Sequence, residues 1–265
     1  MAIKRKSGTE DAGKKGKAKW VDAPTSFDRR CVFMLIYGDT GTGRTSLALT
    51  APGPIALMHT TEKLDGVVSE YAGEKSIRMA NFGGVFSGKP QKIAEKASKH
   101  ISDFKACWYD AVGGWAHTAI VDTATEGWEL LRLARFGTVT PQGQIAHMYG
   151  PVNAEWRSIW KTARMQDFTN VIAVEQTKDE YKRDKSTGRT VRAGQKEIPF
   201  IADVIIRTSR TKDRGFMAEI QKGWWNAHVE GLSLEDEAGT DPEDRSITFS
   251  MIMALITETD EEDWT

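Results

Sequence analysis

Short continuous apolar runs alternate with stretches of helical spacing over most of the chain. The run at 31–37, Cys-Val-Phe-Met-Leu-Ile-Tyr, is typical of a strand buried on both faces of a parallel sheet. By contrast, residues 91–104 place Ile93, Ala97 and Ile101 on one face of a helix. The pattern predicts strands at 31–37, 54–58, 76–80, 117–122, 170–175, 202–208, 216–220 and 247–255, and helices at 44–50, 91–104, 124–135 and 151–167.

This order of elements predicts a three-layer α/β fold with a mostly parallel sheet. The last three predicted strands follow one another without a helix between them, so we expect an antiparallel edge. A chain of 265 residues that is 40% hydrophobic is long enough for one such domain, which we place at residues 25–256.

The net charge of -1 hides an asymmetry between the two ends. Residues 1–24 are basic and poor in apolar side chains, and residues 257–265 are acidic. We interpret both as disordered tails. In one interpretation each tail is only solvated. In the functional alternative, the basic tail binds phosphates, and the acidic tail competes with nucleic acid or docks a partner.

Two further features bound the environment of the protein. No apolar run reaches the roughly 20 residues of a membrane span, and no secretory signal opens the chain. Cys31 and Cys107 form no metal-ligand or disulfide pattern, so we expect buried core roles for both and a reducing, cytoplasmic compartment.

A glycine-rich loop interrupts the pattern after the first strand. Gly38-Asp39-Thr40-Gly41-Thr42-Gly43-Arg44-Thr45 fits G-x-x-x-x-G-[basic]-[ST], with an apolar strand before it and a helix after it. In that context backbone N–H groups and the helix N-terminus can bind phosphate oxygens. The alternative is a purely structural turn. We expect residues 38–46, including Ser46, to bind a nucleotide, and the Thr45 hydroxyl to bind Mg²⁺.

The basic position of this loop is Arg44, where the usual motif has lysine. Arginine is larger and planar, and it does not place its charge where the compact lysine ammonium does. We therefore expect nucleotide binding to survive better than hydrolysis, with slow turnover.

Two acidic residues follow strands that end near the loop. Asp122 ends the strand 117–122, where a carboxylate can hold Mg²⁺ together with Thr45; the alternative is an ordinary helix N-cap. Glu62 follows the second strand and could orient or deprotonate the attacking water; the alternative is a solvated loop residue.

With these motifs in this order, the chain resembles RecA-like P-loop ATPases, and more closely the Sak-type single-strand annealing ATPases of phages and their phage nucleotide-binding relatives. The resemblance runs from about Val32 to Ile220. It implies ATP and Mg²⁺ as cofactors, Glu62 as the catalytic glutamate, Gln176 as the residue that senses the γ-phosphate, and Lys222 as a basic finger toward a neighbour's nucleotide.

The resemblance also places a DNA-binding loop at residues 177–198, directly after Gln176. Basic side chains that neutralise phosphates and an aromatic side chain that stacks on a base suit single-stranded DNA; the alternative is a solvated hairpin. The candidate contacts are Lys178, Tyr181, Lys182, Arg183, Lys185, Arg189, Arg192 and Lys196.

The resulting hypothesis is an ATP-binding protein that acts on single-stranded DNA in annealing or recombination. We expect a homo-oligomer, as a ring or filament, with a single-strand-binding protein as a further partner, and a host-cell location if a phage encodes it. The alternatives are a P-loop ATPase of phage replication or packaging, and a nucleotide-holding structural module.

Overall fold

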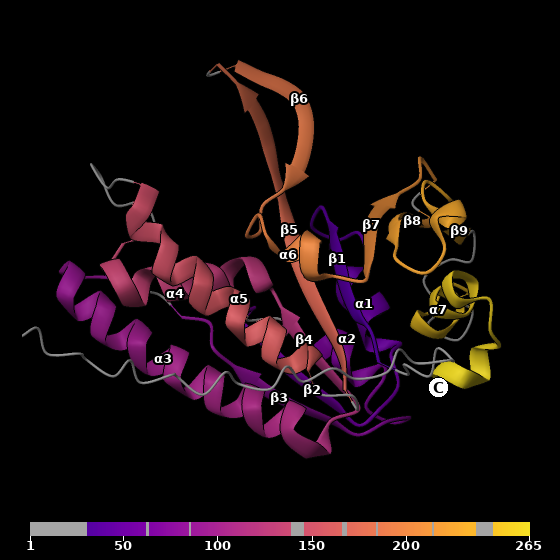
Figure 1. Cartoon of the computed structure of the whole chain (residues 1–265), viewed down its shortest axis with the longest axis horizontal. Coiled ribbons are helices and arrows are strands. Elements are labelled where there is room, and N and C mark those ends of the chain that lie inside the picture. The colour runs from indigo at the N-terminus through magenta and orange to yellow at the C-terminus, as the bar shows by residue number, and fades with distance from the viewer. Residues whose placement is uncertain are drawn as a thin grey trace, which may run out of the picture.

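The computed structural model describes residues 31–61, 64–84, 86–138, 146–165, 169–183, 185–213, 215–236 and 246–265. The predicted basic tail, 1–24, lies outside these residues. Strands and helices alternate through the first half of the chain, and the second half contains several strands that follow one another (Figure 1).

One mixed sheet forms the centre of the fold, in the order β3-β2-β4-β5-β1-β7-β8-β9, with β6 paired to β5. The pairs among the first six strands of that order are parallel, and β7–β8 and β8–β9 are antiparallel, so the predicted antiparallel edge is confirmed. The strands are β1 (Phe33–Gly38), β2 (Ile55–His59), β3 (Ile77–Asn81), β4 (Thr118–Asp122), β5 (Asn170–Lys182), β6 (Lys185–Arg192), β7 (Val204–Arg210), β8 (Phe216–Gly223) and β9 (Ser233–Asp236).

Helices cover both faces of this sheet, which confirms the three-layer α/β prediction. Alternate residues of β1 show the division: Phe33 and Leu35 pack on one face, and Met34 and Ile36 on the other. The first face is covered by α3 (Pro90–Asp110), α4 (Ala124–Phe136) and α5 (Gly150–Arg164); the second by α1 (Arg44–Leu49), α2 (Asp65–Ser69) and α7 (Phe249–Thr257). The shorter helical segments are α6 (Ile198–Ile201), η1 (Ala111–Trp115), η2 (Ala146–Tyr149), η3 (Ala227–Val229) and η5 (Glu261–Trp264).

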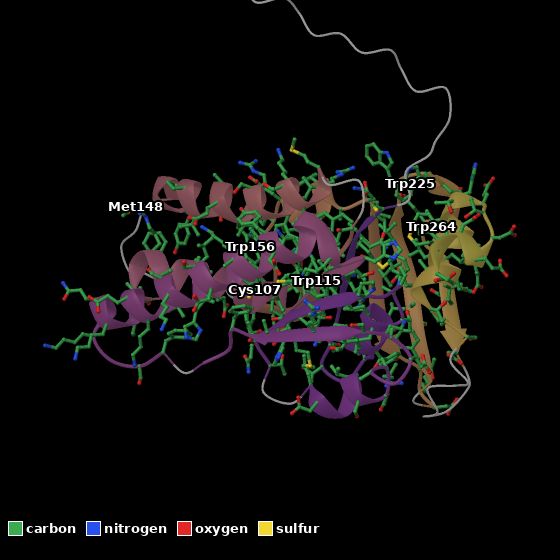
Figure 2. The ribbon with its side chains drawn as sticks, turned by 90° about the horizontal axis from the view of Figure 1, so that it is seen from below. Cys107, Trp115, Met148, Trp156, Trp225 and Trp264 are labelled. Carbon is green, nitrogen blue, oxygen red and sulfur yellow. The ribbon has the colours of Figure 1, made fainter. Side chains whose placement is uncertain are left out.

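Aromatic side chains fill the layer between the sheet and α3, α4 and α5. Trp156 and Trp160 are fully buried, with ring centroids 5.3 Å apart, and Trp160 stacks on Phe33 at 5.2 Å. Trp156 lies within this helical layer in Figure 2. Cys107 directly precedes the buried Trp108 on α3 but is itself exposed. The predicted core role is therefore wrong for Cys107, whereas it holds for Cys31, which is buried. A helix turns its neighbouring side chains apart by about 100°, which puts one of them outside.

The C-terminal region differs from the prediction in two ways. Residues 247–255 form most of helix α7 and no strand, because a short apolar run fits either element and Thr248 caps the helix by accepting a hydrogen bond from the Met251 N–H (3.1 Å). The predicted acidic tail, 257–265, is folded: it ends in η5, and Trp264 is only 6% exposed. The Trp264 ring packs on Phe249, with centroids 6.4 Å apart, and its carbonyl accepts a hydrogen bond from the Ser250 hydroxyl (2.9 Å). Burial of one apolar side chain therefore holds this segment against α7, while the acidic residues around it stay exposed to solvent.

Within the part of the chain that is described, no helix is both long enough and apolar enough to cross a bilayer.

Because Trp264 is the buried anchor of the C-terminus, we expect Trp264→Ala to lower the free energy of unfolding by about 3 kcal/mol. Urea denaturation measures this change. Glu262→Ala, which alters an exposed side chain two residues away, is the control. Equal stability of the two variants would contradict a folded C-terminus.

Candidate functional site

The glycine-rich loop connects β1 to α1 at the carboxyl edge of the sheet. Gly43 has φ 83° and stands at the N-cap of α1, a backbone conformation that glycine adopts without strain. Gly38 lies so close to β7 that a Cβ there would be 2.4 Å from the carbonyl oxygen of Thr208. Thr42 connects the loop to β7: its hydroxyl lies 2.7 Å from the Asp39 carbonyl oxygen and 2.7 Å from the Thr208 hydroxyl.

The first residues of α1 meet the end of β4. The Thr45 hydroxyl donates a hydrogen bond to the Asp122 carboxylate (2.5 Å), and Asp122 is almost fully buried. Burial raises the pKa of Asp122, and the Thr45 hydrogen bond and the nearby Arg44 oppose that rise. A hydroxyl and a carboxylate oxygen are hard donors of the kind that Mg²⁺ prefers, so this pair fits the predicted metal ligands.

Arg44 reaches across the loop toward β5. Its guanidinium donates a hydrogen bond to the carbonyl oxygen of Glu175 (2.6 Å). Burial lowers the pKa of Arg44, and the carboxylates of Asp122, Asp39 and Glu126 counteract this. The basic position of the loop therefore stands in an acidic cluster and binds the neighbouring strand directly.

A cavity of about 790 Å³ opens over the loop. This volume lies within the range of small-molecule and cofactor sites. The predicted residues Thr40, Gly41, Gly43, Arg44, Thr45, Ser46, Asp122 and Gln176 line it together with Thr60, Thr61, Leu64, Val67, Gly84, Thr123, Glu126 and Arg210. The other loop residues do not line the cavity: Gly38 and Thr42 contact Thr208 on β7, and Asp39 accepts a hydrogen bond from the Thr177 hydroxyl on β5.

Thr125 and Glu126, in the first turn of α4, bind Gln176 and were not among the residues predicted for the site. Gln176 donates hydrogen bonds from its backbone N–H to the Thr125 hydroxyl (3.0 Å) and from its side-chain amide to the Glu126 carboxylate (3.0 Å). The signal was present in the sequence, because Thr123-x-x-Glu126 is a capping-box pattern and Thr123 does accept a hydrogen bond from the Glu126 N–H (3.2 Å).

Two predicted catalytic residues have different outcomes. Glu62 lies outside the described residues; Thr60 and Thr61, which precede it, line the cavity. Lys222 lies on β8 opposite Ile205, near the start of β7, whereas the glycine-rich loop lies beside the end of β7. Its amine donates to the carbonyl oxygens of Pro199 (3.1 Å) and Ala202, and burial lowers its pKa. Lys222 is therefore not part of its own chain's cavity, and a role toward a neighbour's nucleotide stays a prediction.

The predicted DNA-binding loop is a long β-hairpin. It consists of the outer half of β5 and all of β6, and it projects from the body of the molecule (Figure 1). Tyr181 is 63% exposed. The basic candidates Lys178, Lys182, Arg183, Lys185, Arg189 and Lys196 are also exposed.

Arg192 is the exception among these candidates. It lies at the base of the hairpin, its side chain is only 15% exposed, and it forms an ion pair with the Glu175 carboxylate. Its guanidinium also donates to the Gln195 carbonyl oxygen (2.8 Å). These contacts give Arg192 a structural role at the hairpin base, apart from the exposed basic residues.

Glu175 thus has two contacts at this junction: its carbonyl binds Arg44, and its carboxylate binds Arg192. The carboxylate is completely buried, and Gly194 packs so closely against it that a Cβ there would be 1.9 Å from one of its oxygens. Burial raises the pKa of Glu175 to about 7, and the Arg192 charge and hydrogen bond only partly oppose this.

Comparisons with known proteins assign no family. No protein-family model matches the sequence, and no curated protein matches it. A solved structure that resembles the chain is the crystal structure of the RadB recombinase, with 12% sequence identity and a TM-score of 0.47. The match covers 77% of this chain and 86% of that one. A similarity of this size carries no conclusion about function.

The buried Glu175 predicts a pH dependence of stability. Its pKa in the folded protein lies above the ordinary value of 4.5, so the folded state binds the proton more tightly than the unfolded chain does. The stability from this group is complete below about pH 4.5 and is lost as the pH rises toward 7. Relative to Glu175→Gln, the wild-type free energy of unfolding should fall by at most about 3 kcal/mol over that range.

Urea denaturation of both proteins at several pH values between 4.5 and 7.5 measures this difference. A constant difference in unfolding free energy across that range would contradict the assignment.

Proposed function

We propose that this chain is a RecA-like protein that binds ATP with Mg²⁺ and uses the bound nucleotide to control a hairpin that binds single-stranded DNA, in annealing or recombination. The observation that carries the proposal is a direct connection: β5 passes from the nucleotide cavity at Gln176 straight into the exposed basic hairpin.

The nucleotide part is supported by the geometry of the loop. Gly41 and Gly43 have positive φ angles, α1 begins at Arg44, and all three residues line the cavity, an arrangement typical of loops whose backbone N–H groups bind phosphate. Thr45 and Asp122 are the residues that would hold Mg²⁺. When bound, the ion would neutralise phosphate charge and fix the phosphates in place.

Slow hydrolysis is supported by the contact of Arg44. A guanidinium that donates to the Glu175 carbonyl must divide its donors between that backbone oxygen and a phosphate. Arg44 would then hold the phosphates and β5 together, and would stabilise the transferring phosphoryl group less well than a lysine does.

The DNA part is supported by the composition and exposure of the hairpin. Five exposed basic side chains on the hairpin, Lys196 just after it, and Tyr181 combine phosphate neutralisation with base stacking, which gives binding without sequence preference. The exposed Lys182 amine also lies 3.8 Å from the half-buried Glu180 carboxylate, a contact long enough to exchange for a phosphate. An assembly in a ring or filament would place Lys222 of one protomer toward the nucleotide of the next.

A second candidate function is a nucleotide-holding structural module, and the engagement of Arg44 with the Glu175 backbone favours it. In that case nucleotide would stabilise the fold without changing the affinity for DNA.

Arg44→Lys should raise the rate of ATP hydrolysis about tenfold, because one charge-assisted contact to the transferring phosphate lowers the barrier by about 1.4 kcal/mol or more. Phosphate release in the presence of Mg²⁺ and single-stranded DNA measures the rate. Arg135→Lys is the control, since Arg135 is exposed in the last turn of α4 and does not line the cavity. An Arg44→Lys protein no faster than the wild type would contradict the role given to Arg44.

Replacing Lys182, Arg183, Lys185 and Arg189 by glutamine should weaken binding to a fluorescent oligothymidylate. The slope of log affinity against log salt should also become shallower by about 3, at about 0.7 per lost phosphate contact. Anisotropy titrations at several salt concentrations measure both quantities.

The matched control replaces four exposed lysines at the start of α3, outside the hairpin: Lys89, Lys92, Lys96 and Lys99. Equal losses in the two quadruple variants would contradict a specific role of the hairpin.

A further inference from the structure

Gln176 is fixed at the point where β5 leaves the sheet. It is the last β5 residue in register with β1, opposite Gly38, and Thr177 begins the pairing with β6. The first turn of α4 binds it twice, through the Thr125 hydroxyl and the Glu126 carboxylate, each at 3.0 Å. The base of the hairpin is thus tied to the helix that follows Asp122.

The position of Glu126 is unfavourable for binding an anion. Its carboxylate lines the phosphate-facing cavity, close enough to Asp122 to contribute to raising the pKa of that residue. Arg44 is the cation whose charge Glu126 influences there, and Glu129 is the next carboxylate along the helix. A negative group beside a phosphate site opposes phosphate binding, so its use must lie in what it contacts, which is the Gln176 amide.

We propose that Glu126 is a positioning residue that holds the side chain of Gln176 when no triphosphate is bound, and that the terminal phosphate of a nucleoside triphosphate takes this donor over. The proposal rests on the proposed function, because it assumes that a nucleotide fills the cavity. What is new is the competitor: the phosphate would compete with the Glu126 carboxylate for the Gln176 amide.

The competition sets how strongly the site distinguishes a triphosphate from a diphosphate. A hydrogen bond from an amide to a carboxylate is stronger than one to a neutral acceptor. Only a ligand with a third phosphate gains a new partner for Gln176 in return for breaking this bond. Glu126 therefore lowers the affinity for the triphosphate and couples its binding to the base of the hairpin.

Two variants separate the hydrogen bond from the charge. Glu126→Ala removes both, whereas Glu126→Gln removes the charge and keeps an oxygen that accepts from the Gln176 amide. Glu129→Ala is the control on the same helix: Glu129 pairs with Arg132 at 3.2 Å, does not line the cavity and makes no hydrogen bond to Gln176.

The experiment has two arms on the full-length protein. The first measures hydrogen exchange over residues 177–192 without nucleotide and DNA. The second measures dissociation constants for fluorescent analogues of ADP and of non-hydrolysable ATP, with Mg²⁺ present.

In the first arm, Glu126→Ala should speed exchange at the hairpin base about tenfold, while Glu126→Gln and Glu129→Ala stay near the wild type. In the second, Glu126→Ala should raise the preference for the triphosphate over the diphosphate about tenfold, and Glu126→Gln should raise it by less.

Wild-type exchange and wild-type preference in Glu126→Ala would overturn the inference. Equal changes in Glu126→Ala and Glu126→Gln would also overturn it, because they would assign the effect to charge alone. If the wild type binds neither analogue, the proposed function fails and the competition with phosphate fails with it. The exchange arm alone then decides whether Glu126 positions Gln176.

Discussion

The parallel pairing of β5 with β1 and β4 is the constraint on which the rest of the structure depends. In this register Gly38 lies opposite Gln176, and Asp122 lies opposite Val174, two residues earlier on β5. Because the carboxyl ends of parallel strands meet at one edge of the sheet, the glycine-rich loop, the Asp122 carboxylate and Gln176 come together there. A shift of one residue in β5 would turn Gln176 to the opposite face.

Strand β5 also connects the cavity to the hairpin. Most strands of the sheet end at that edge, but β5 continues for six residues beyond Gln176, to Lys182, and returns as β6. At the junction Arg44 binds the Glu175 carbonyl, Arg192 binds the Glu175 carboxylate, and α4 binds Gln176. Arg44 and α4 therefore contact the residues from which the hairpin leaves the sheet, and Arg192 of the hairpin pairs with the same Glu175. If a nucleotide and DNA bind at the two ends of this connection, any coupling between them must act in both directions.

Much of the central fold could be predicted because its signals are local. The apolar runs of β1, β2, β4 and β5 and the glycine-rich loop are each visible within ten residues. The strand predicted at residues 247–255 is wrong because a mostly apolar stretch of nine residues fits a strand or a buried helix, and packing against the sheet decides between them.

What the sequence could not give is contacts between distant segments. Arg192 looks like any other basic residue of the hairpin until Glu175, seventeen residues earlier, is placed beside it in a buried ion pair. Glu126 reads as an ordinary helix-capping glutamate until Gln176, fifty residues later, reaches it. Trp264 stands in an acidic stretch, and nothing in that stretch predicts that its ring is buried against Phe249. In each case the partner is chosen by the tertiary fold and not by spacing along the chain.

The central claim is that the nucleotide cavity and the basic hairpin are coupled through the end of β5. The affinity of the wild-type protein for a fluorescent oligothymidylate, measured at fixed salt with and without a non-hydrolysable ATP analogue and Mg²⁺, tests it most directly. We expect the affinity to change at least about fivefold when the analogue is present, which is the lower end of typical coupling between sites. An affinity for DNA that stays the same when the analogue is bound would contradict it.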